Sequence, residues 1–433
     1  MYKWEMVDLQ GESIEDLKRR LFQEIDRRKE EIARLCSCII KVPSENPPGD
    51  TTAVASLLRD HLNEIGFKPM WYEPKKGIVN LVAKTKGRER PSLVLNAHMD
   101  VFPAGDRKRW DFDPYSGKVS STKVYGRGAV DMKGGLTASL IAFSLIGALD
   151  VELPGTLALT LVSDEEVGGE LGTEWLLNNV KDLMWDACII GEPSGTDCVV
   201  YGEKGVNLVT VRVKGLGSAH GTAPFVESAI SKAAMIIRVG EELDLKGQIP
   251  SVLKPLMESQ KQYFSARYGS KVADSVDHVF INVGTIKGGI RPNIISPSCE
   301  MEVCIRVPLS VDPEEVVRIW ESKVRNYLGK IKASFIFDVK WKASYTDPLE
   351  SIVRYTTRNV MALLGRKPRQ IISLWGSDAR LLRRRGIPTV LYGPSPDTMA
   401  TFNEFIQIRE LIQVAKVHTG TALDYLWGLP VAR

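Results

Sequence analysis

Side chains of the kinds that bind metal ions directly follow three short apolar runs of the sequence. They are His98 and Asp100 after SLVLNA, Glu165 and Glu166 after LALTLVS, and Glu192 after CIIG. A fourth segment, YGRGAVDMKGG, places Asp131 in a glycine-rich loop. One imidazole and several carboxylates form a donor set that suits a divalent metal ion. These residues therefore predict a metal centre, in which Asp100 holds the His98 ring by its second nitrogen.

Each of these features also has a simpler explanation. An acidic residue at the end of a single strand is more often solvated than catalytic. The glycines of YGRGAVDMKGG could indicate a phosphate-binding loop, but the segment lacks the GKS or GKT ending of such loops. The metal interpretation depends on four separate segments all carrying ligand-type side chains.

The order of secondary structure gives a reason for these segments to meet. NLVAK, SLVLNA, LALTLVS and CIIG are short β-type runs, and helical patterns over 134–149 and 171–180 lie between them. This alternation predicts an α/β fold with a mostly parallel sheet covered by helices. Ligands bind beyond the carboxyl ends of the strands in such sheets, so we expect the side chains to converge there.

A second pattern interrupts the first. Residues 206–342 read as strand, helix, strand, strand, helix, strand, which predicts a small split-βαβ domain inserted into the larger one. Helical patterns over 348–364 and 404–427 then return to the first architecture, and Ser13 with Asp16 caps an amphipathic N-terminal helix. The predicted domains are a catalytic domain formed by 1–205 and 343–433, and an insert formed by 206–342.

Composition excludes several classes of protein. The chain has 433 residues, of which 44% are hydrophobic and 25% charged, so it can form two ordered domains. A net charge of +4 is too small to favour nucleic acid as a partner. The charged N-terminus resembles no signal peptide and no apolar run could span a membrane, so we expect a cytoplasmic protein with a small-molecule substrate. The six cysteines show no metal-ligand spacing and are expected to be reduced.

The motifs together resemble one family, the co-catalytic zinc amidohydrolases and peptidases. Its members include acetylornithine deacetylase, succinyl-diaminopimelate desuccinylase, the aminoacylases, carnosinase-type dipeptidases and the folate-cleaving glutamate carboxypeptidases. The motifs that carry the resemblance are NAHMDVFPAG, YGRGAVDMKGG, SDEEVGG, IGEPSG, GSAHGTAPF, GTIKGGIRPNIIS and GSDAR, with the GP and NEF of the tail. The resemblance implies a zinc-exopeptidase-like catalytic domain with a ferredoxin-like lid, which is also the dimerisation domain of the family.

The resemblance also implies roles for single residues at the metal centre. Asp131 would bridge two zinc ions, with His98 and Glu192 on one ion and Glu166 on the other. Glu165 would be the general base that takes a proton from water, and Asp100 would orient the histidine.

Further roles concern the substrate. His220 would donate to the oxyanion in the partner's active site of a homodimer, although a packed turn histidine is the alternative. Asn293 and Arg306 would bind a substrate carboxylate, although an internal salt bridge could also explain Arg306. Ser377 and Asp378 would shape the substrate pocket, or form a simple turn.

The tail departs from the family pattern. The segment LYGPSPDTMATFNEF (391–405) contains no histidine, and Ala400 occupies the position of the family's second-metal ligand. Three explanations follow: Asp397 replaces the ring and shifts preference toward Mn²⁺ or Co²⁺, the enzyme works with one metal, or hydrolysis has been lost.

The sequence thus predicts a metal-dependent hydrolase that cleaves an N-acyl, N-carbamoyl or peptide bond of a small carboxylate-bearing, amino-acid-like substrate. One or two Zn²⁺ ions would serve as cofactor. The alternatives are a dipeptidase or carboxypeptidase, and a non-hydrolytic binding protein on the same fold.

Overall fold

The chain is described here by a computed structural model that covers residues 13–219, 228–329 and 332–428. It folds into two compact units. Unit 1 contains the segments up to Tyr201, Thr346–Gln370 and from Ser377 onward, and unit 2 contains Gly202–Tyr345 with Ile371–Gly376. The predicted insert of 206–342 falls inside unit 2, which also takes up the short return segment at 371–376.

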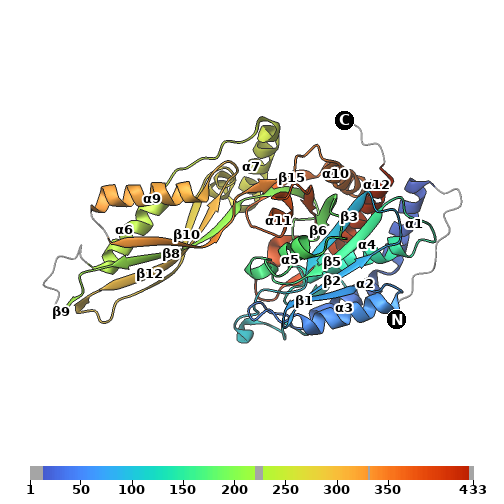
Figure 1. Cartoon of the computed structure of the whole chain (residues 1–433), viewed down its shortest axis with the longest axis horizontal. Helices are drawn as coiled ribbons and strands as arrows, with labels where there is room; N and C mark the ends of the chain where they lie inside the picture. Colours follow the sequence, from blue (N-terminus) through green and yellow to red (C-terminus); the bar gives the residue numbers. More distant parts are fainter. Residues whose placement is uncertain (1–12, 220–227, 330–331, 429–433) are drawn as a thin grey trace. The chain divides into compact units, whose positions relative to one another are not determined.

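Unit 1 is built around a twisted sheet with a parallel centre (Figure 1). Its strands run in the order β1-β2-β5-β3-β6-β16-β7, in which β5, β3, β6 and β16 are parallel and the outer pairs are antiparallel. The bounds are β1 Met70–Lys75, β2 Ile78–Lys84, β3 Ser92–His98, β5 Thr156–Val162, β6 Ala187–Ile190, β7 Cys198–Glu203, β15 Arg369–Ser373 and β16 Thr389–Leu391. The predicted α/β class with a mostly parallel central sheet is confirmed.

Helices flank this sheet. They are α1 Ile14–Arg27, α2 Lys29–Ile40, α3 Thr52–Glu64, α4 Lys133–Gly147, α5 Thr173–Asn179, α10 Ser351–Leu364, α11 Ala379–Arg383 and α12 Ile408–Trp427. Helix α4 is buried along almost its whole length, as expected for the most apolar run of the chain. A small two-stranded sheet pairs β4 (Lys123–Tyr125) with β17 (Phe405–Gln407), and so joins the segment before Asp131 to the tail.

The N-terminal helical pattern forms two helices rather than one. The side chain of Ser13 caps α1 by accepting from the amide of Asp16 at 3.2 Å, as predicted. Helix α1 ends at Arg27, the backbone of Arg28 leaves the helical geometry with φ of −99° and ψ of 16°, and α2 begins at Lys29. The apolar spacing continues across this break, so it could not reveal the change of direction.

Unit 2 is an antiparallel sheet with two helices packed on one face. The strand order is β10-β12-β8-β13, the arrangement of a split-βαβ fold. The elements are β8 Gly205–Lys214, β9 Ser218–Ala219, α6 Ala229–Glu241, α7 Lys254–Tyr268, α8 Ser270–Asp274, β10 Phe280–Gly288, β11 Ile294–Ile295, β12 Ser298–Val307, α9 Pro313–Leu328, β13 Ala333–Lys340 and β14 Ser344–Tyr345. Helices α7 and α8 were not predicted.

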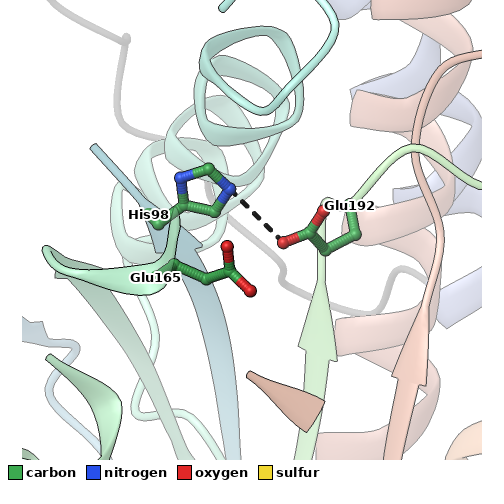
Figure 2. Close-up of side chains that lie close together, drawn as sticks. All are labelled: His98, Glu165 and Glu192. Atoms are coloured by element: carbon green, nitrogen blue, oxygen red, sulfur yellow. Dashed lines mark ion pairs between the residues drawn. The ribbon is translucent and has the colours of Figure 1, made fainter. Parts of the chain in front are cut away.

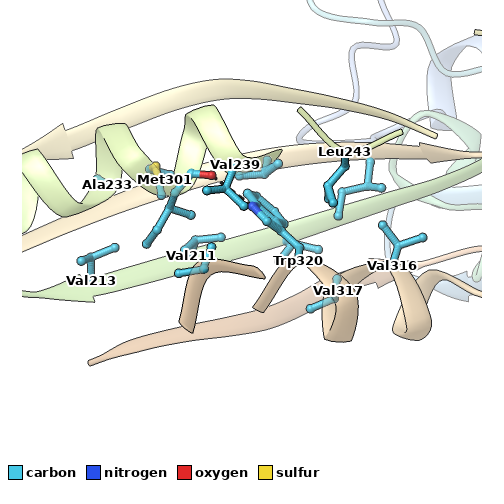
Figure 3. Close-up of a cluster of buried hydrophobic side chains, with 14 of the residues drawn as sticks. Val211, Val213, Ala233, Val239, Leu243, Met301, Val316, Val317 and Trp320 are labelled. Carbon is cyan, nitrogen blue, oxygen red and sulfur yellow. Dashed lines mark hydrogen bonds between the residues drawn. The ribbon is translucent and has the colours of Figure 1, made fainter. Parts of the chain in front are cut away.

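The core of unit 2 lies between the sheet and helices α6 and α9 (Figure 3). Trp320 of α9 is fully buried there, and its indole N–H donates to the carbonyl of Ile236 at 3.0 Å. Alternate residues of β8 and β12 point into this core, which is the pattern of a sheet with one covered face. No helix in the described parts of the chain is both long and apolar enough to cross a membrane.

Candidate metal centre

Strand register places the predicted ligands at one edge of the unit 1 sheet. In the parallel ladder His98 pairs with Val162 of β5, and Asn96 pairs with Ile190 of β6. The turns after β3, β5 and β6 therefore begin at nearly the same level. These turns carry, in order, Asp100, the pair of glutamates and Glu192. The parallel sheet thus brings together segments that lie far apart in sequence, as predicted.

The imidazole of His98 is buried and held at both nitrogens. Its Nδ1 lies 2.8 Å from the carbonyl oxygen of Asp100 and 3.7 Å from the Asp100 carboxylate. Its Nε2 lies 3.2 Å from Asp131 Oδ1 and 3.4 Å from Glu192 Oε1. The carbonyl contact at Nδ1 leaves Nε2 facing two carboxylates, which is the orientation of a metal-binding histidine.

Glu192 and Glu165 complete a compact group around this nitrogen. Ligand atoms of His98, Glu165 and Glu192 all lie within 4.8 Å of one another, so the three could bind one ion. Figure 2 shows both carboxylates near the imidazole, with the ion pair from His98 to Glu192 marked. Glu165, which the sequence analysis expects to be the general base, thus also lies close enough to His98 and Glu192 to contact an ion bound between them.

Glu165 and Glu166 lie in an irregular loop that follows β5. Asp164 has a left-handed backbone with φ of 72°, and a single 3-10 turn then spans Glu165–Val167. The carboxylate of Asp100 accepts hydrogen bonds from the backbone amides of Glu165 at 3.3 Å and Glu166 at 3.2 Å. It also accepts from the side-chain amide of Asn46 at 2.9 Å. Asp100 therefore anchors this loop as well as the His98 ring.

The loop that presents Asp131 is held by a residue of the tail. Glu404 is fully buried, and its Oε1 accepts from the amides of Val130 at 2.8 Å and Asp131 at 3.2 Å. Its Oε2 accepts from Arg127 Nη1 at 2.5 Å, and Arg127 Nη2 donates to the carbonyl of Ala400 at 3.3 Å. Hydrogen bonds thus link the tail segment to the position of Asp131.

The carboxylates of the centre lie so close together that they raise one another's pKa values. Burial raises the pKa of Glu165 and of Glu166 well above the usual range, with further increases from Glu192 and Asp131 respectively. Burial likewise raises the pKa of Glu192 to about 7. Burial alone would lower the pKa of His98, but its contacts with Asp131 and Glu192 raise it well above the usual value. Glu166 Oε1 is buried without a hydrogen-bond partner. A bound divalent cation would satisfy these oxygens, so the donor set fits a metal ion.

The structure places the remaining predicted residues as follows. Ser377 and Asp378 are buried in unit 1, where Asp378 adds negative charge near Glu165 and Glu192. Asn293 is exposed and Arg306 half-buried, both in unit 2. His220 lies outside the described residues. Asp397 is exposed, and its Oδ2 accepts from Ser395 Oγ at 2.8 Å.

Sequence reasoning missed several residues that support the centre. Asn46 donates to Asp100, and Glu404 accepts from the amides of Val130 and Asp131. Lys133 lies near enough to Glu404 and Asp100 to interact with their charges. The Lys133 ammonium is buried, donates to the carbonyl of Val42 at 2.6 Å, and has its pKa lowered by burial to about 7. The NEF motif of the tail is a signal that could have led to Glu404. Nothing in the loop VPSENPPGD signals the role of Asn46.

Comparisons with known proteins agree with this geometry. Residues 94–424 match the sequence profile of peptidase family M20/M25/M40. The chain is 26% identical to the N-formyl-4-amino-5-aminomethyl-2-methylpyrimidine deformylase of Halalkalibacterium halodurans, over 94% of this chain and 96% of that one.

Solved structures share the fold. A metallo-carboxypeptidase of the M20 family, Sso-CP2 from Sulfolobus solfataricus, matches with a TM-score of 0.78 and 20% identity over 92% of this chain and all of that one. The YXEP protein of Bacillus subtilis, described as a dinuclear metal-binding peptidase of the M20 family, matches with a TM-score of 0.61 and 15% identity over 93% of this chain and all of that one. With the profile spanning most of its length, the chain belongs to peptidase family M20/M25/M40 and is a metal-dependent amidohydrolase or peptidase.

Proposed function

We propose that this enzyme removes a small acyl group, such as formyl, from the nitrogen of a small substrate. The observation that carries the proposal is the close group formed by the buried residues His98 and Glu192 and the half-buried Glu165, with Asp131 beside it. The proposal is also supported by the relative from Halalkalibacterium halodurans, whose name describes a deformylase, because it aligns over nearly the whole of both chains.

His98, Asp131 and Glu192 would hold the primary metal ion, with Glu166 available to a second. A zinc ion bound there would act as a Lewis acid that polarises the amide carbonyl and lowers the pKa of water. Manganese and cobalt would suit the carboxylate-rich donor set as well. Because His98 is the only histidine of the centre among the described residues, binding of a second ion there would rely on carboxylates.

Glu165 is positioned to act as the general base. Its carboxylate lies beside the metal ligands, and its backbone is fixed by Asp100. It would take a proton from the attacking water and transfer it to the nitrogen of the leaving amine. A raised pKa suits this exchange, since the group must both accept and release a proton near neutral pH. His220 would donate a hydrogen bond to the developing oxyanion.

The family resemblance further suggests that Arg306 and Asn293 bind a carboxylate of the substrate. Within the described parts of the chain, the guanidinium of Arg306 has no ion-pair partner. Arg306 lies on β12, and a planar guanidinium binds a carboxylate with two parallel hydrogen bonds. Asn293 would contribute an amide to the same ligand. The family resemblance further suggests a homodimer formed through unit 2.

A peptidase is the second candidate, and a specific similarity favours it. Sso-CP2, which shares the fold, is described as a carboxypeptidase. Cleavage of a dipeptide would use the same base and the same ion, and would differ only in the groups that surround the scissile bond.

A substrate panel tests the proposal. The enzyme, loaded with Zn²⁺, Mn²⁺ or Co²⁺, is incubated with N-formyl amines, N-acetyl, N-succinyl and N-carbamoyl amino acids, and dipeptides, and the release of free amine is measured. We expect turnover of an N-acyl compound, and a decrease of about 10³-fold in kcat for Glu165→Gln. The exposed residue Glu64 supplies the control, Glu64→Gln. Preference for dipeptides would favour the second candidate, and no turnover of any compound would refute both.

A further inference from the structure

We propose that Arg380 and Asp378 are positioning residues that fix the loop carrying Glu165. This base loop is defined as residues 164–172. The inference rests on the proposed function, because it takes Glu165 as the general base. Arg380 and Asp378 lie far along the chain from this loop, at the start of α11, and belong to unit 1 together with it.

The base loop depends on contacts from outside itself. Residues with positive φ recur in it, namely Asp164 at 72°, Gly168 at 132° and Gly169 at 71°. Apart from one 3-10 turn it forms no regular structure before α5 begins. Its internal hydrogen bonds all lie within a few residues of one another. The amides of Val167 and Gly169 donate to the carbonyl of Asp164 at 3.4 and 2.6 Å, that of Gly168 donates to the carbonyl of Glu165 at 2.9 Å, and that of Leu171 donates to Asp164 Oδ2 at 3.0 Å. Such a segment keeps one conformation only when its surroundings determine it.

Arg380 supplies one of these contacts. Its side chain is buried, with 6% of its surface exposed, and its Nη2 donates to the carbonyl of Gly168. Its Nη1 donates to the carbonyl of Ser377. One planar guanidinium thus joins the base loop to the turn before α11. The amide of Gly168 donates to the carbonyl of Glu165, so Arg380 is linked to the backbone of the base through one intervening residue.

Asp378 supplies the second contact. It is buried, and its Oδ2 accepts from Thr173 Oγ1 at 2.6 Å, where α5 begins at the end of the base loop. Thr173 Oγ1 in turn accepts from Asn96 at 3.2 Å, and Asn96 Oδ1 accepts from Thr160 at 2.7 Å. This chain of hydrogen bonds connects Asp378 to strands β3 and β5, which carry the metal centre. Its length and burial favour a fixed geometry over a mobile one.

Close packing completes the arrangement. A Cβ atom built on Gly169 would lie 2.3 Å from Asp378 Oδ1, so the carboxylate occupies the space that a side chain there would need. The base loop is therefore held at its start by Asp100, through the amides of Glu165 and Glu166, and at its end by Arg380 and Asp378. Displacing a catalytic group by about 1 Å can reduce a rate by about 100-fold.

Arg380→Met and Arg384→Met test the role of Arg380 by kinetics. Arg384 is the matched control, since it follows the same helix but its exposed side chain pairs with Glu174 at the surface. We expect kcat to fall roughly 10- to 100-fold in Arg380→Met, with KM changed less than about threefold and metal content unchanged. Arg380→Lys, which keeps a donor and a positive charge, should recover part of kcat. If Arg380→Met folds, binds metal and keeps its kcat, the proposal is wrong.

Hydrogen exchange tests the same inference without any enzymatic activity. Amide exchange of peptides covering 163–172 should accelerate in Arg380→Met and in Asp378→Asn, relative to the wild-type enzyme and Arg384→Met. Hydrogen exchange separates the positioning role from the proposed hydrolytic function. If the wild-type protein hydrolyses no substrate, the function is refuted, but the effect of the variants on exchange can still be measured. Unchanged exchange in both variants would refute the positioning role, and so would equal acceleration in Arg384→Met.

Discussion

At the scale of single residues, the centre gathers several buried and half-buried carboxylates around one imidazole, His98. Buried carboxylates gain protons when no cation neutralises them. Here the pKa of Glu192 rises to about 7, and those of Glu165, Glu166 and His98 rise well above their usual values. A metal ion can bind only when these protons leave, because it requires a neutral ring and ionised carboxylates.

Metal binding should therefore release protons and weaken as the pH falls. Glu192, whose pKa is raised to about 7, binds a proton increasingly below that pH, so the apparent affinity for the ion should decrease from about pH 8 to about pH 6. Calorimetric titration with Zn²⁺ in two buffers of different ionisation enthalpy checks this. The heats should differ between the buffers near neutral pH. Identical heats and an affinity that is constant across this range would contradict the account.

Ala400 lies where the tail meets the Asp131 loop, and no imidazole stands at its position. Its carbonyl accepts from Arg127, which also binds Glu404 beneath Asp131. Its φ of 56° lies in the left-handed region, which histidine adopts more readily than most residues. Ala400→His should therefore raise the zinc content by about one ion per chain, since it adds an imidazole donor. Ala400→Leu is the control of similar size, and equal zinc content in both variants would contradict the prediction.

The sequence pointed to His98, Glu165 and Glu192, whose ligand atoms the structure brings within 4.8 Å of one another, but it could not give their contacts. His98, Glu165 and Glu192 follow strands, and the parallel order of those strands determines that they meet. The sequence could not show that Nδ1 of His98 contacts a carbonyl more closely than a carboxylate. It also gave no role to Glu404, because that role depends on a loop in a distant part of the chain.

At the scale of elements, two glycines allow α4 and the end of β6 to approach closely. A Cβ atom on Gly135 would lie 1.9 Å from the carbonyl oxygen of Gly191, which directly precedes Glu192. The contact is between two backbones, so neither side can yield by rotating a side chain. The packing of this helix therefore determines the position of Glu192, the proposed metal ligand.

Gly135→Ala should destabilise the protein and weaken metal binding. Alanine is favoured over glycine within a helix by about 1 kcal/mol, so propensity alone predicts the opposite sign. We expect the clash between the added Cβ and the carbonyl oxygen of Gly191 to outweigh the gain in helix propensity. The free energy of unfolding should then fall by about 2 kcal/mol, measured by urea denaturation of the metal-free protein. Gly284→Ala in β10 is the control, since the nearest atom to its added Cβ is 3.7 Å away. A stabilised Gly135→Ala protein would show that the backbones can separate.

The fold was predictable where the pattern of apolar residues is regular. Strands β2, β3, β5 and β6 and the strands of the four-stranded sheet in unit 2 were found because each is a short β-branched run between breaks. Helix α7 was missed because its apolar residues form no clear stripe, and few of its side chains are buried. The end of α1 at Arg27 was missed because no glycine or proline marks it.

At the scale of the whole molecule, unit 2 presents an apolar strand edge. Strand β10 lies at the edge of its sheet, and Phe280 and Ile286 are each about half exposed. Exposed apolar edge strands pair readily with another chain, and a second copy would satisfy the free backbone groups. This agrees with the homodimer proposed above.

Light scattering coupled to size-exclusion chromatography of the wild-type protein should give about twice the chain mass of 48.1 kDa. Replacing Phe280 and Ile286 together by Asp should give the mass of a single chain, because charge on the edge opposes pairing. Val252→Asp, at another exposed apolar site of unit 2, should leave the mass unchanged. A single-chain mass for the wild-type protein, or a dimer that persists in the double variant, would contradict the interface.

Hydrolysis by this enzyme should require a divalent ion held by His98, Asp131 and Glu192. Elemental analysis by mass spectrometry, run beside the amine-release assay, tests it on the wild-type enzyme and Glu192→Gln. We predict about one ion or more per wild-type chain, and a fall of at least about tenfold in both metal affinity and turnover in the variant. A wild-type chain that retains no ion after incubation with Zn²⁺, Mn²⁺ and Co²⁺, or a variant with undiminished turnover, would contradict this prediction.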